Sequence, residues 1–285
     1  MKICGKCGAT FDEQTVSDVC SFCGEKLTRV QDDAPVQTFT QPQQKGKGGF
    51  LAKLLSVVVA VAVGAGVKIG MEKIFEHNRE KDALKELNKT KTVAQAYIPG
   101  QFDSTGYSSL FWNMRMNADN HLLMMEKAEL DSLQTTMAAS MESSIKAGLE
   151  NSNVSEKVKQ EAVDSVSAKT EMGFYLVDSS MEMEAYGFLM TMSLPTTKKT
   201  DISQVMEESI KKAGSNQMQF ISSGQDTLAG QNYDVVKCKV TQDGVSIIMN
   251  MYCRTKGGMT AIMYLYYPEG LSEAEDHFKQ KVRMY

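Results

Sequence analysis

A run of apolar residues from position 50 to position 71 constrains this chain of 285 residues more than any other feature. The run reads FLAKLLSVVVAVAVGAGVKIGM, and no charge interrupts it between Lys53 and Lys68. It is apolar all around a helix, so it offers water no polar face. Lys53 and Lys68 can extend their amines toward a membrane surface, which brings the span to the ~20 residues that a bilayer needs. We therefore expect a single transmembrane helix over 50–71, the alternative being a helix or strand buried in a soluble core.

Four of the six cysteines precede this run and form two CxxC pairs, each followed by a glycine. Two thiolates on each of two tight turns supply the four ligands of a tetrahedral zinc ion, and a closed set of this kind leaves no open position for catalysis. We predict one structural zinc ion held by Cys4, Cys7, Cys20 and Cys23. Two disulfides, a redox-active pair and a rubredoxin-like iron site are the alternatives.

The CxxCG…CxxCG pattern resembles the zinc ribbon that begins many bacterial membrane proteins. The resemblance covers residues 1–28 and implies a small module that folds around its metal. Acidic and basic residues are balanced within the ribbon, and the whole chain carries 31 Lys and Arg against 35 Asp and Glu. No basic field indicates nucleic acid as a partner, whereas protein partners are compatible with this composition.

Polar segments flank the apolar run. Residues 29–49 are rich in Gln and broken by prolines, which predicts a flexible linker. Residues 72–97 are rich in charge and predict a helical stalk, in which Glu86 and Lys89 are spaced to pair on one face. Counting Lys and Arg alone does not favour an N-terminus on the cytoplasmic side. Because metal-binding thiols are safest in a reducing compartment, we expect a cytoplasmic ribbon, with residues 98–285 outside the cell membrane.

Residues 98–285 mix helical and strand patterns. Helices are expected over 126–150, 155–167, 200–214 and from 272 onward, where Ser272 and Glu275 predict a capping box. Strands are expected over 107–116, 171–179 and 184–195, followed by three strands within 231–268. The segment 222–231 is expected to be a loop. Hairpin signals at Asp243-Gly244 and Lys256-Gly257-Gly258 predict antiparallel pairing, so we expect the α+β class, with an antiparallel sheet covered by helices.

The order of these elements, with LAGQNYDVV leading into a three-strand meander and a closing helix, resembles the PsbP-like α/β/α sandwich. The resemblance covers roughly residues 105–285, and the helical segment at 126–167 departs from it. It implies a binding or assembly domain rather than a fixed chemistry.

Methionines and aromatic residues recur at strand spacing in this region. The methionine pairs are Met114 and Met116, Met181 and Met183, Met190 and Met192, and Met249 and Met251. They suit copper(I), but we interpret them as core filler. The aromatic residues are Trp112, Tyr264, Tyr266 and Tyr267. They are also expected to pack in the core, with a ligand-facing patch as the alternative.

Catalytic patterns are missing from the sequence. His77, His121 and His277 lie far apart, and no nucleophile elbow, P-loop or dinucleotide fingerprint occurs. Cys238 and Cys253 should lie four positions out of register on one hairpin, as separate buried thiols. We expect a membrane-anchored binding or scaffold protein, not an enzyme. The alternative is a single-pass sensor whose outer domain binds a ligand and signals to the ribbon.

Overall fold

The computed structural model describes two compact units, residues 1–43 and residues 44–285. In the first unit it describes the backbone of 2–4, 10–11 and 27–29, and in the second it describes 80–150, 155–166, 168–193, 202–213, 218–242 and 244–285. The strands of the first unit are β1 (Lys2–Cys4), β2 (Thr10–Phe11) and β3 (Leu27–Arg29). They form an antiparallel sheet in the order β2-β1-β3.

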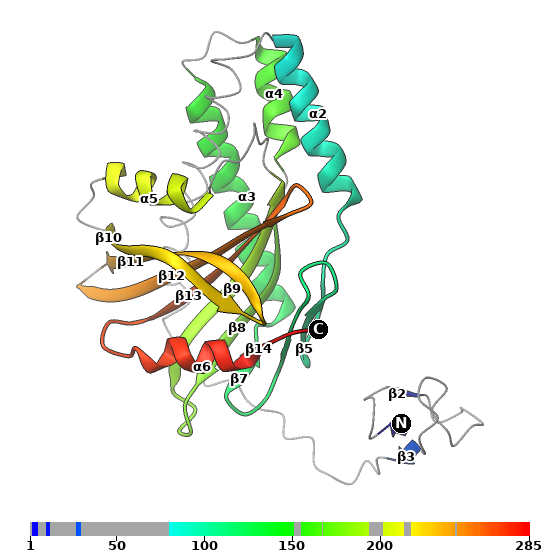
Figure 1. The fold of residues 1–285 in the computed structure, drawn as a ribbon, viewed down its shortest axis with the longest axis vertical. Coiled ribbons are helices and arrows are strands. Elements are labelled where there is room, and N and C mark those ends of the chain that lie inside the picture. The colour runs from blue at the N-terminus through cyan, green and yellow to red at the C-terminus, as the bar shows by residue number, and fades with distance from the viewer. Residues whose placement is uncertain are drawn as a thin grey trace. The chain divides into compact units, whose positions relative to one another are not determined.

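A seven-stranded sheet dominates the second unit (Figure 1). Its strands are β7 (Leu122–Met124), β8 (Ala168–Val177), β9 (Met183–Ser193), β10 (Met218–Leu228), β11 (Gln231–Gln242), β12 (Val245–Lys256) and β13 (Met259–Pro268). The order is β10-β11-β12-β13-β9-β8-β7, and every neighbouring pair is antiparallel.

A four-stranded sheet and five helices complete the described part of this unit. The small sheet has the order β14-β6-β5-β4, from β4 (Gln101–Asp103), β5 (Gly106–Ser109), β6 (Met114–Asn117) and β14 (Val282–Arg283). The helices are α2 (Glu80–Ala96), α3 (Lys127–Leu149), α4 (Glu156–Ser165), α5 (Ile202–Ala213) and α6 (Glu273–Lys281). The unit therefore belongs to the predicted α+β class, with antiparallel sheets.

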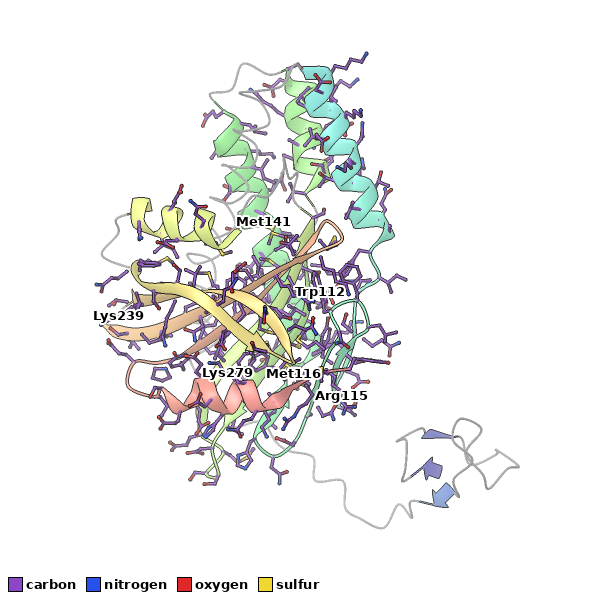
Figure 2. All side chains as sticks on the ribbon, in the orientation of Figure 1. Trp112, Arg115, Met116, Met141, Lys239 and Lys279 are labelled. Carbon is purple, nitrogen blue, oxygen red and sulfur yellow. The ribbon has the colours of Figure 1, made fainter. Side chains whose placement is uncertain are left out.

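Both faces of the large sheet are buried except along the edge strand β10, and two hydrophobic clusters lie on them. Side chains from α2, α3, α4 and α5 join one cluster, while the small sheet and α6 contribute to the other. Figure 2 shows Met141 of α3 on the helix-covered side and Met116 of β6 among the side chains of the other. Along β12, Met249 and Met251 face the helices, whereas Ile248 and Tyr252 face the opposite way. The sequence predicted a cover of helices, and one face instead carries a second sheet together with α6.

Helices that were predicted from apolar periodicity are confirmed. The expected stripe of α3 is buried along its whole length: Leu130, Leu133, Met137, Met141, Ile145 and Leu149. The helix expected over 72–97 is present from Glu80, and Glu86 and Lys89 form an ion pair of 3.8 Å. This helix is not solvated on all sides, because Leu87 packs into the core cluster shared with α3 and α4.

The predicted register of the β11–β12 hairpin is confirmed. Cys238 lies opposite Met249, and Cys253 lies opposite Asp234. Both cysteines are buried, and no disulfide joins them. The next turn, at Gly257 and Gly258, has φ angles of +57° and +82°, which suit a two-residue hairpin turn.

Two strand predictions are wrong. The single strand expected over 107–116 is a hairpin of β5 and β6, which reverses through a turn where Asn113 has a φ angle of +53°. The loop expected over 222–231 is mostly strand β10 and its turn into β11. β10 lies at the sheet edge and most of its side chains are exposed, so polar residues replace the apolar alternation that identifies a strand.

Two further local predictions are corrected. Ser272 has a helical backbone and its side chain caps nothing, while Glu275 turns toward the sheet, so the predicted capping box does not form. Met181 has a φ angle of +62° and precedes β9, so it does not share a strand face with Met183. The other three methionine pairs are buried, as expected of core filler.

Candidate functional site

The predicted zinc ligands and membrane run fall mainly on residues that the structure does not describe. Cys4 is described only through its backbone in β1, and Cys7, Cys20 and Cys23 lie outside the described residues, as does the run over 50–71. Within the described ranges, no helix is both long and apolar enough to cross a membrane. In those same ranges no group of three or more His, Cys, Asp or Glu side chains could hold a metal ion.

The structure does not bring the described histidines together. His121 Nδ1 lies 3.1 Å from the carbonyl oxygen of Val177. His277 Nδ1, on α6, lies 3.0 Å from Glu184 Oε2 on β9. His77 lies outside the described residues. Each described imidazole contacts a different partner, so the two do not form a shared histidine site.

Glu171 is the most buried carboxylate among the described residues, and it lies at a bulge in β8. Its side chain accepts four hydrogen bonds from the chain. Tyr97 and Thr191 donate to Oε1, at 2.5 Å and 2.6 Å. Tyr107 and the backbone amide of Gly100 donate to Oε2, at 2.6 Å and 2.9 Å. Because donors from separate segments converge here, Glu171 ties the chain after α2 and the small sheet to the large sheet.

The tyrosines around Glu171 remain proton donors. Burial raises the pKa of Tyr97 and of Tyr107, and the charge of Glu171 raises both pKa values further. Trp112 Nε1 donates to the Tyr97 hydroxyl at 2.7 Å, so the sole tryptophan of the chain is part of the same network. Both carboxylate oxygens of Glu171 thus accept hydrogen bonds from the protein, which is the geometry of a structural carboxylate.

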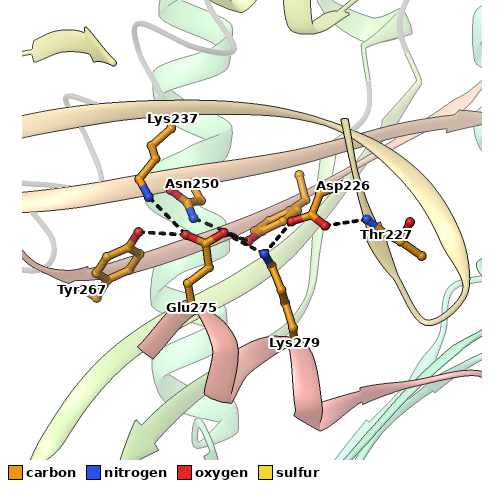
Figure 3. A network of polar contacts seen from close by, with 8 residues as sticks. Asp226, Thr227, Lys237, Asn250, Tyr267, Glu275 and Lys279 are labelled. Carbon is orange, nitrogen blue, oxygen red and sulfur yellow. Dashed lines mark hydrogen bonds and ion pairs between the residues drawn. The ribbon is translucent and has the colours of Figure 1, made fainter. Parts of the chain in front are cut away.

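A second network lies on the opposite face of the large sheet from the helices, where α6 meets β11, β12 and β13 (Figure 3). Glu275 Oε2 lies 3.1 Å from Lys237 Nζ and accepts a hydrogen bond of 3.1 Å from Tyr267. Glu275 Oε1 lies 2.9 Å from Lys279 Nζ and accepts a hydrogen bond of 3.2 Å from Tyr252. One carboxylate on α6 thereby contacts two lysines and side chains from β11, β12 and β13.

The charge of Glu275 is fixed by its partners. Burial alone would raise the pKa of this carboxyl, but hydrogen bonds from Lys279, Asn250 and Lys237 lower it to about 2. Lys279 also pairs with Asp226 on β10 at 2.6 Å. A general acid or base works best with a pKa near the working pH, so this ionised carboxylate is suited to clamping α6 onto the sheet.

Two exposed apolar residues are sequence neighbours of two aromatic residues that contact each other. Ile98 and Leu110 are the most exposed large hydrophobic residues in the described ranges, at 78% and 74%. Their neighbours Tyr97 and Phe111 are half-buried and meet edge to face at 5.0 Å. Lys256 Nζ lies 5.1 Å from the Phe111 ring centroid. We name Tyr97, Ile98, Leu110, Phe111 and Lys256 the Leu110 surface. It combines apolar side chains with one cation, and its Tyr97 donates a hydrogen bond to Glu171.

Most of these groups were missed by sequence reasoning. Glu171 shares strand β8 with a second charged residue, Lys169, so no local pattern marked it as the buried one. Glu275 was assigned to a capping box because its spacing from Ser272 fitted that local role. Trp112, Tyr264, Tyr266 and Tyr267 are buried in the core, as expected.

No protein-family model and no curated protein matches the sequence. Several solved structures show a low similarity to the chain, among them the following three. LpqN of Mycobacterium tuberculosis, described as involved in cell envelope biogenesis, is 11% identical, with a TM-score of 0.29 over 41% of this chain and 78% of its own. CyanoP, the PsbP protein of Synechocystis sp. PCC 6803, is also 11% identical, with a TM-score of 0.35 over 67% and 99%.

The third structure is PA94 of Pseudomonas aeruginosa, 8% identical, with a TM-score of 0.29 over 40% of this chain and 77% of its own. All three scores are too low to carry an argument, so the α+β class rests on the elements themselves.

Proposed function

We propose that this chain is a membrane-anchored binding module. In this proposal the two CxxC pairs hold one structural zinc ion in a cytoplasmic ribbon, and residues 50–71 anchor the chain in the cell membrane. The unit from Glu80 onward lies on the other side and binds a protein partner. The cysteine spacing and the apolar run support the first two parts.

The Leu110 surface supports the third part. Single exposed apolar residues are common on proteins, but here two are sequence neighbours of an aromatic pair, one ring of which contacts a lysine. Aromatic residues are enriched at protein interfaces, where a few well-packed anchors carry most of the binding energy. The base is rigid, since Tyr97 donates to buried Glu171. A surface that is ordered before it meets its partner loses less entropy on binding.

In-cell photo-crosslinking tests this surface. A photoreactive residue is placed at Ile98 in the full chain, alone and together with Leu110→Asp. We expect a discrete adduct at position 98 that Leu110→Asp reduces at least about tenfold, because a charge would enter the apolar contact. Leu110 is exposed, so the substitution should change the unfolding midpoint little.

The matched control places the same photoreactive residue at Gln225, an exposed position on β10. It should not give the adduct seen at position 98. No adduct at 98, or one that Leu110→Asp leaves unchanged, would count against the Leu110 surface as a binding site.

A second candidate function is a single-pass sensor, whose outer unit binds a ligand and signals to the ribbon. One observation favours it. Three buried tyrosine hydroxyls on the helix-covered face of the large sheet have no hydrogen-bond partner in the described part of the chain.

A further inference from the structure

The small sheet places two arginines opposite each other on its solvent side. Arg115 lies on β6 (Figure 2), directly opposite Arg283 of β14, and both side chains are exposed. Met116 and Val282, the next pair along these two strands, are buried in the core cluster. Side chains that are directly opposite share one face of a sheet, with Cβ atoms about 5 Å apart. The two guanidinium groups therefore start from neighbouring points on the solvent side.

This arginine pair is unfavourable for the fold, because like charges directly opposite each other destabilise a pair of strands. β14 has only two residues, so Arg283 occupies one of the two positions through which this strand pairs with β6. Among the described strand pairs of the second unit, no other register position sets two charges of like sign opposite each other. A neutral or acidic residue at either position would serve the sheet better.

No acidic residue in the described part of the chain neutralises the pair. Neither arginine side chain forms an ion pair or a hydrogen bond with another described residue. Two acidic residues near the ends of the small sheet already have partners. Asp119 pairs with Lys281 at 2.6 Å, and Asp103 accepts hydrogen bonds from the hydroxyl and the amide of Thr105 at 2.6 Å and 2.7 Å. The positive charge of the arginine pair is thus left for a group outside the unit.

Hydrogen-bond donors continue the row across the remaining strands. Arg115 lies opposite Ser108 of β5, and Ser108 lies opposite Gln101 of β4. One register row therefore contains two guanidinium groups, a hydroxyl and an amide, all of which can donate. A guanidinium binds a carboxylate through two parallel N–H···O bonds, which are among the stronger hydrogen bonds in proteins. The composition of this row suits carboxylate groups.

The same hairpin carries part of the Leu110 surface. Leu110 lies in the turn between β5 and β6, just before the strand that holds Arg115. Two cations of β12 fix this turn: Lys256 donates to the carbonyl oxygen of Phe111 at 2.5 Å, and Arg254 donates to that of Trp112 at 3.2 Å. A partner segment that contacts exposed Leu110 and continues along the solvent side of the hairpin reaches the arginine row.

The charge does not extend along the sheet. The neighbouring row on the solvent side consists of Asn117, Gly106 and Asp103, which add no cation. Anionic membranes and nucleic acids are bound through larger basic clusters, of ~4–8 Lys and Arg for a membrane surface. Two arginines beside apolar residues fit a protein segment that carries both carboxylates and apolar side chains.

We propose that Arg115 and Arg283 form a recognition site for the acidic side chains of a protein partner, in a segment whose apolar residues contact Leu110. The inference rests on the proposed binding function, and it names the chemistry of the partner.

The test uses the full chain, labelled with ¹³C at its methionine methyl groups, and two peptide probes of nearly equal shape. The probes are acetyl-Leu-Glu-Glu-Leu-amide and acetyl-Leu-Gln-Gln-Leu-amide. Met284 reports on the site, because it follows Arg283 directly and is 57% exposed, and its signal is assigned with Met284→Leu. We expect the Glu peptide to shift this signal saturably, less so at high salt, and the Gln peptide to bind at least about tenfold more weakly.

Arginine variants locate the contact and separate binding from stability. Arg115→Gln and Arg283→Gln should each weaken binding of the Glu peptide about tenfold. Each should also leave the urea unfolding midpoint unchanged or raise it, because the repulsion between the two arginines is removed. Lys281→Gln is the matched control, since it removes one positive charge two residues from Arg283 but from a lysine that already pairs with Asp119. It should change peptide binding by less than about twofold.

Three outcomes would overturn the site. Equal binding of both peptides, or of neither, would show that the arginines recognise no carboxylate. A lower unfolding midpoint in both arginine variants would show that the pair serves the small sheet. Binding of dihexanoyl phosphatidylserine that Arg283→Gln abolishes, without binding of the Glu peptide, would assign the pair to a lipid headgroup.

The photo-crosslinking result at Ile98 is a separate measurement, so the two proposals can fail separately. An adduct at position 98 that forms although the Glu peptide does not bind would leave the Leu110 surface as the binding site and remove the arginine pair. Binding of the Glu peptide without an adduct at position 98 would remove the Leu110 surface and leave the carboxylate site.

Discussion

At the scale of single residues, the two glutamates of the described networks stabilise the unit in different surroundings. Glu171 is nearly inaccessible and receives only neutral donors, while Glu275 faces two lysines at a half-buried rim. A buried carboxylate depends on every one of its hydrogen bonds, because water cannot replace a lost donor. Glu171 should therefore tolerate substitution less well than a surface glutamate.

Glu171→Gln tests that expectation. The amide retains the shape of the side chain but replaces one acceptor by a donor that faces hydroxyl and amide donors. We expect a loss of about 2 kcal/mol in the free energy of unfolding, in the range for hydrogen bonds to a charged group. Urea unfolding followed by the fluorescence of Trp112 measures it, since this sole tryptophan belongs to the same network. Glu129→Gln, at an exposed position, is the control and should stay within about 0.5 kcal/mol; equal effects would refute the role given to Glu171.

At the scale of elements, the hairpin turns set the register on which both faces of the large sheet depend. Gly258 has a φ angle of +82°, and a Cβ there would lie 3.1 Å from Val93 of α2. Gly224 lies in β10, and a Cβ there would meet no atom within 4 Å. The backbone conformation at position 258 therefore requires glycine, whereas position 224 has room for a larger residue.

Gly258→Ala should lower the free energy of unfolding by about 1–2 kcal/mol, since alanine is disfavoured in the left-handed region. Gly224→Ala should leave it unchanged or raise it slightly. Thermal and urea unfolding of both variants measure the difference. Similar losses in the two variants would show that the β12–β13 turn does not need its glycine.

The same elements show how far sequence reasoning reaches. The apolar stripe of α3 predicts its helix and its buried face, because periodicity reports directly which side meets a core. The β11–β12 register follows from one turn, and it places Cys238 opposite Met249 as predicted. β10 was not predicted, because most of its side chains are exposed and its sequence lacks the apolar alternation of a half-buried strand.

The candidate sites depend on contacts between distant segments, and for that reason the sequence shows little of them. Tyr97 and Tyr107 are each more than 60 residues from Glu171 in the sequence, and no local pattern predicts a contact over such a separation. The tyrosines of β13 were expected in the core, but only the pairing of β13 with β9 shows that Tyr266 stacks on Tyr186.

At the scale of the whole molecule, the chain consists of two compact units that are expected to fold independently of each other. The predicted zinc site belongs to the first, and both described carboxylate networks belong to the second. A ribbon of this size has too small a core to fold without its metal. Metal removal should therefore act on one unit alone.

Chelation of the purified chain should release one zinc ion and make four cysteines reactive toward a thiol reagent, while Cys238 and Cys253 stay protected by burial. Trp112 fluorescence should not change, because Trp112 belongs to the second unit. Elemental analysis and thiol counting provide the measurement. A chain purified without zinc, or a change at Trp112 on chelation, would contradict the predicted organisation.

The open edge of β10 has a consequence for molecules held close together. An unpaired strand invites a strand from another copy, and this pairing is the usual route to aggregation. Here the edge carries Ser222, Ser223 and Gln225, and the register shifts between Phe220 and Ser222, which bends the ladder that a second strand would need to follow. We therefore expect neighbouring copies of this protein to resist pairing through this edge into a continuous β structure.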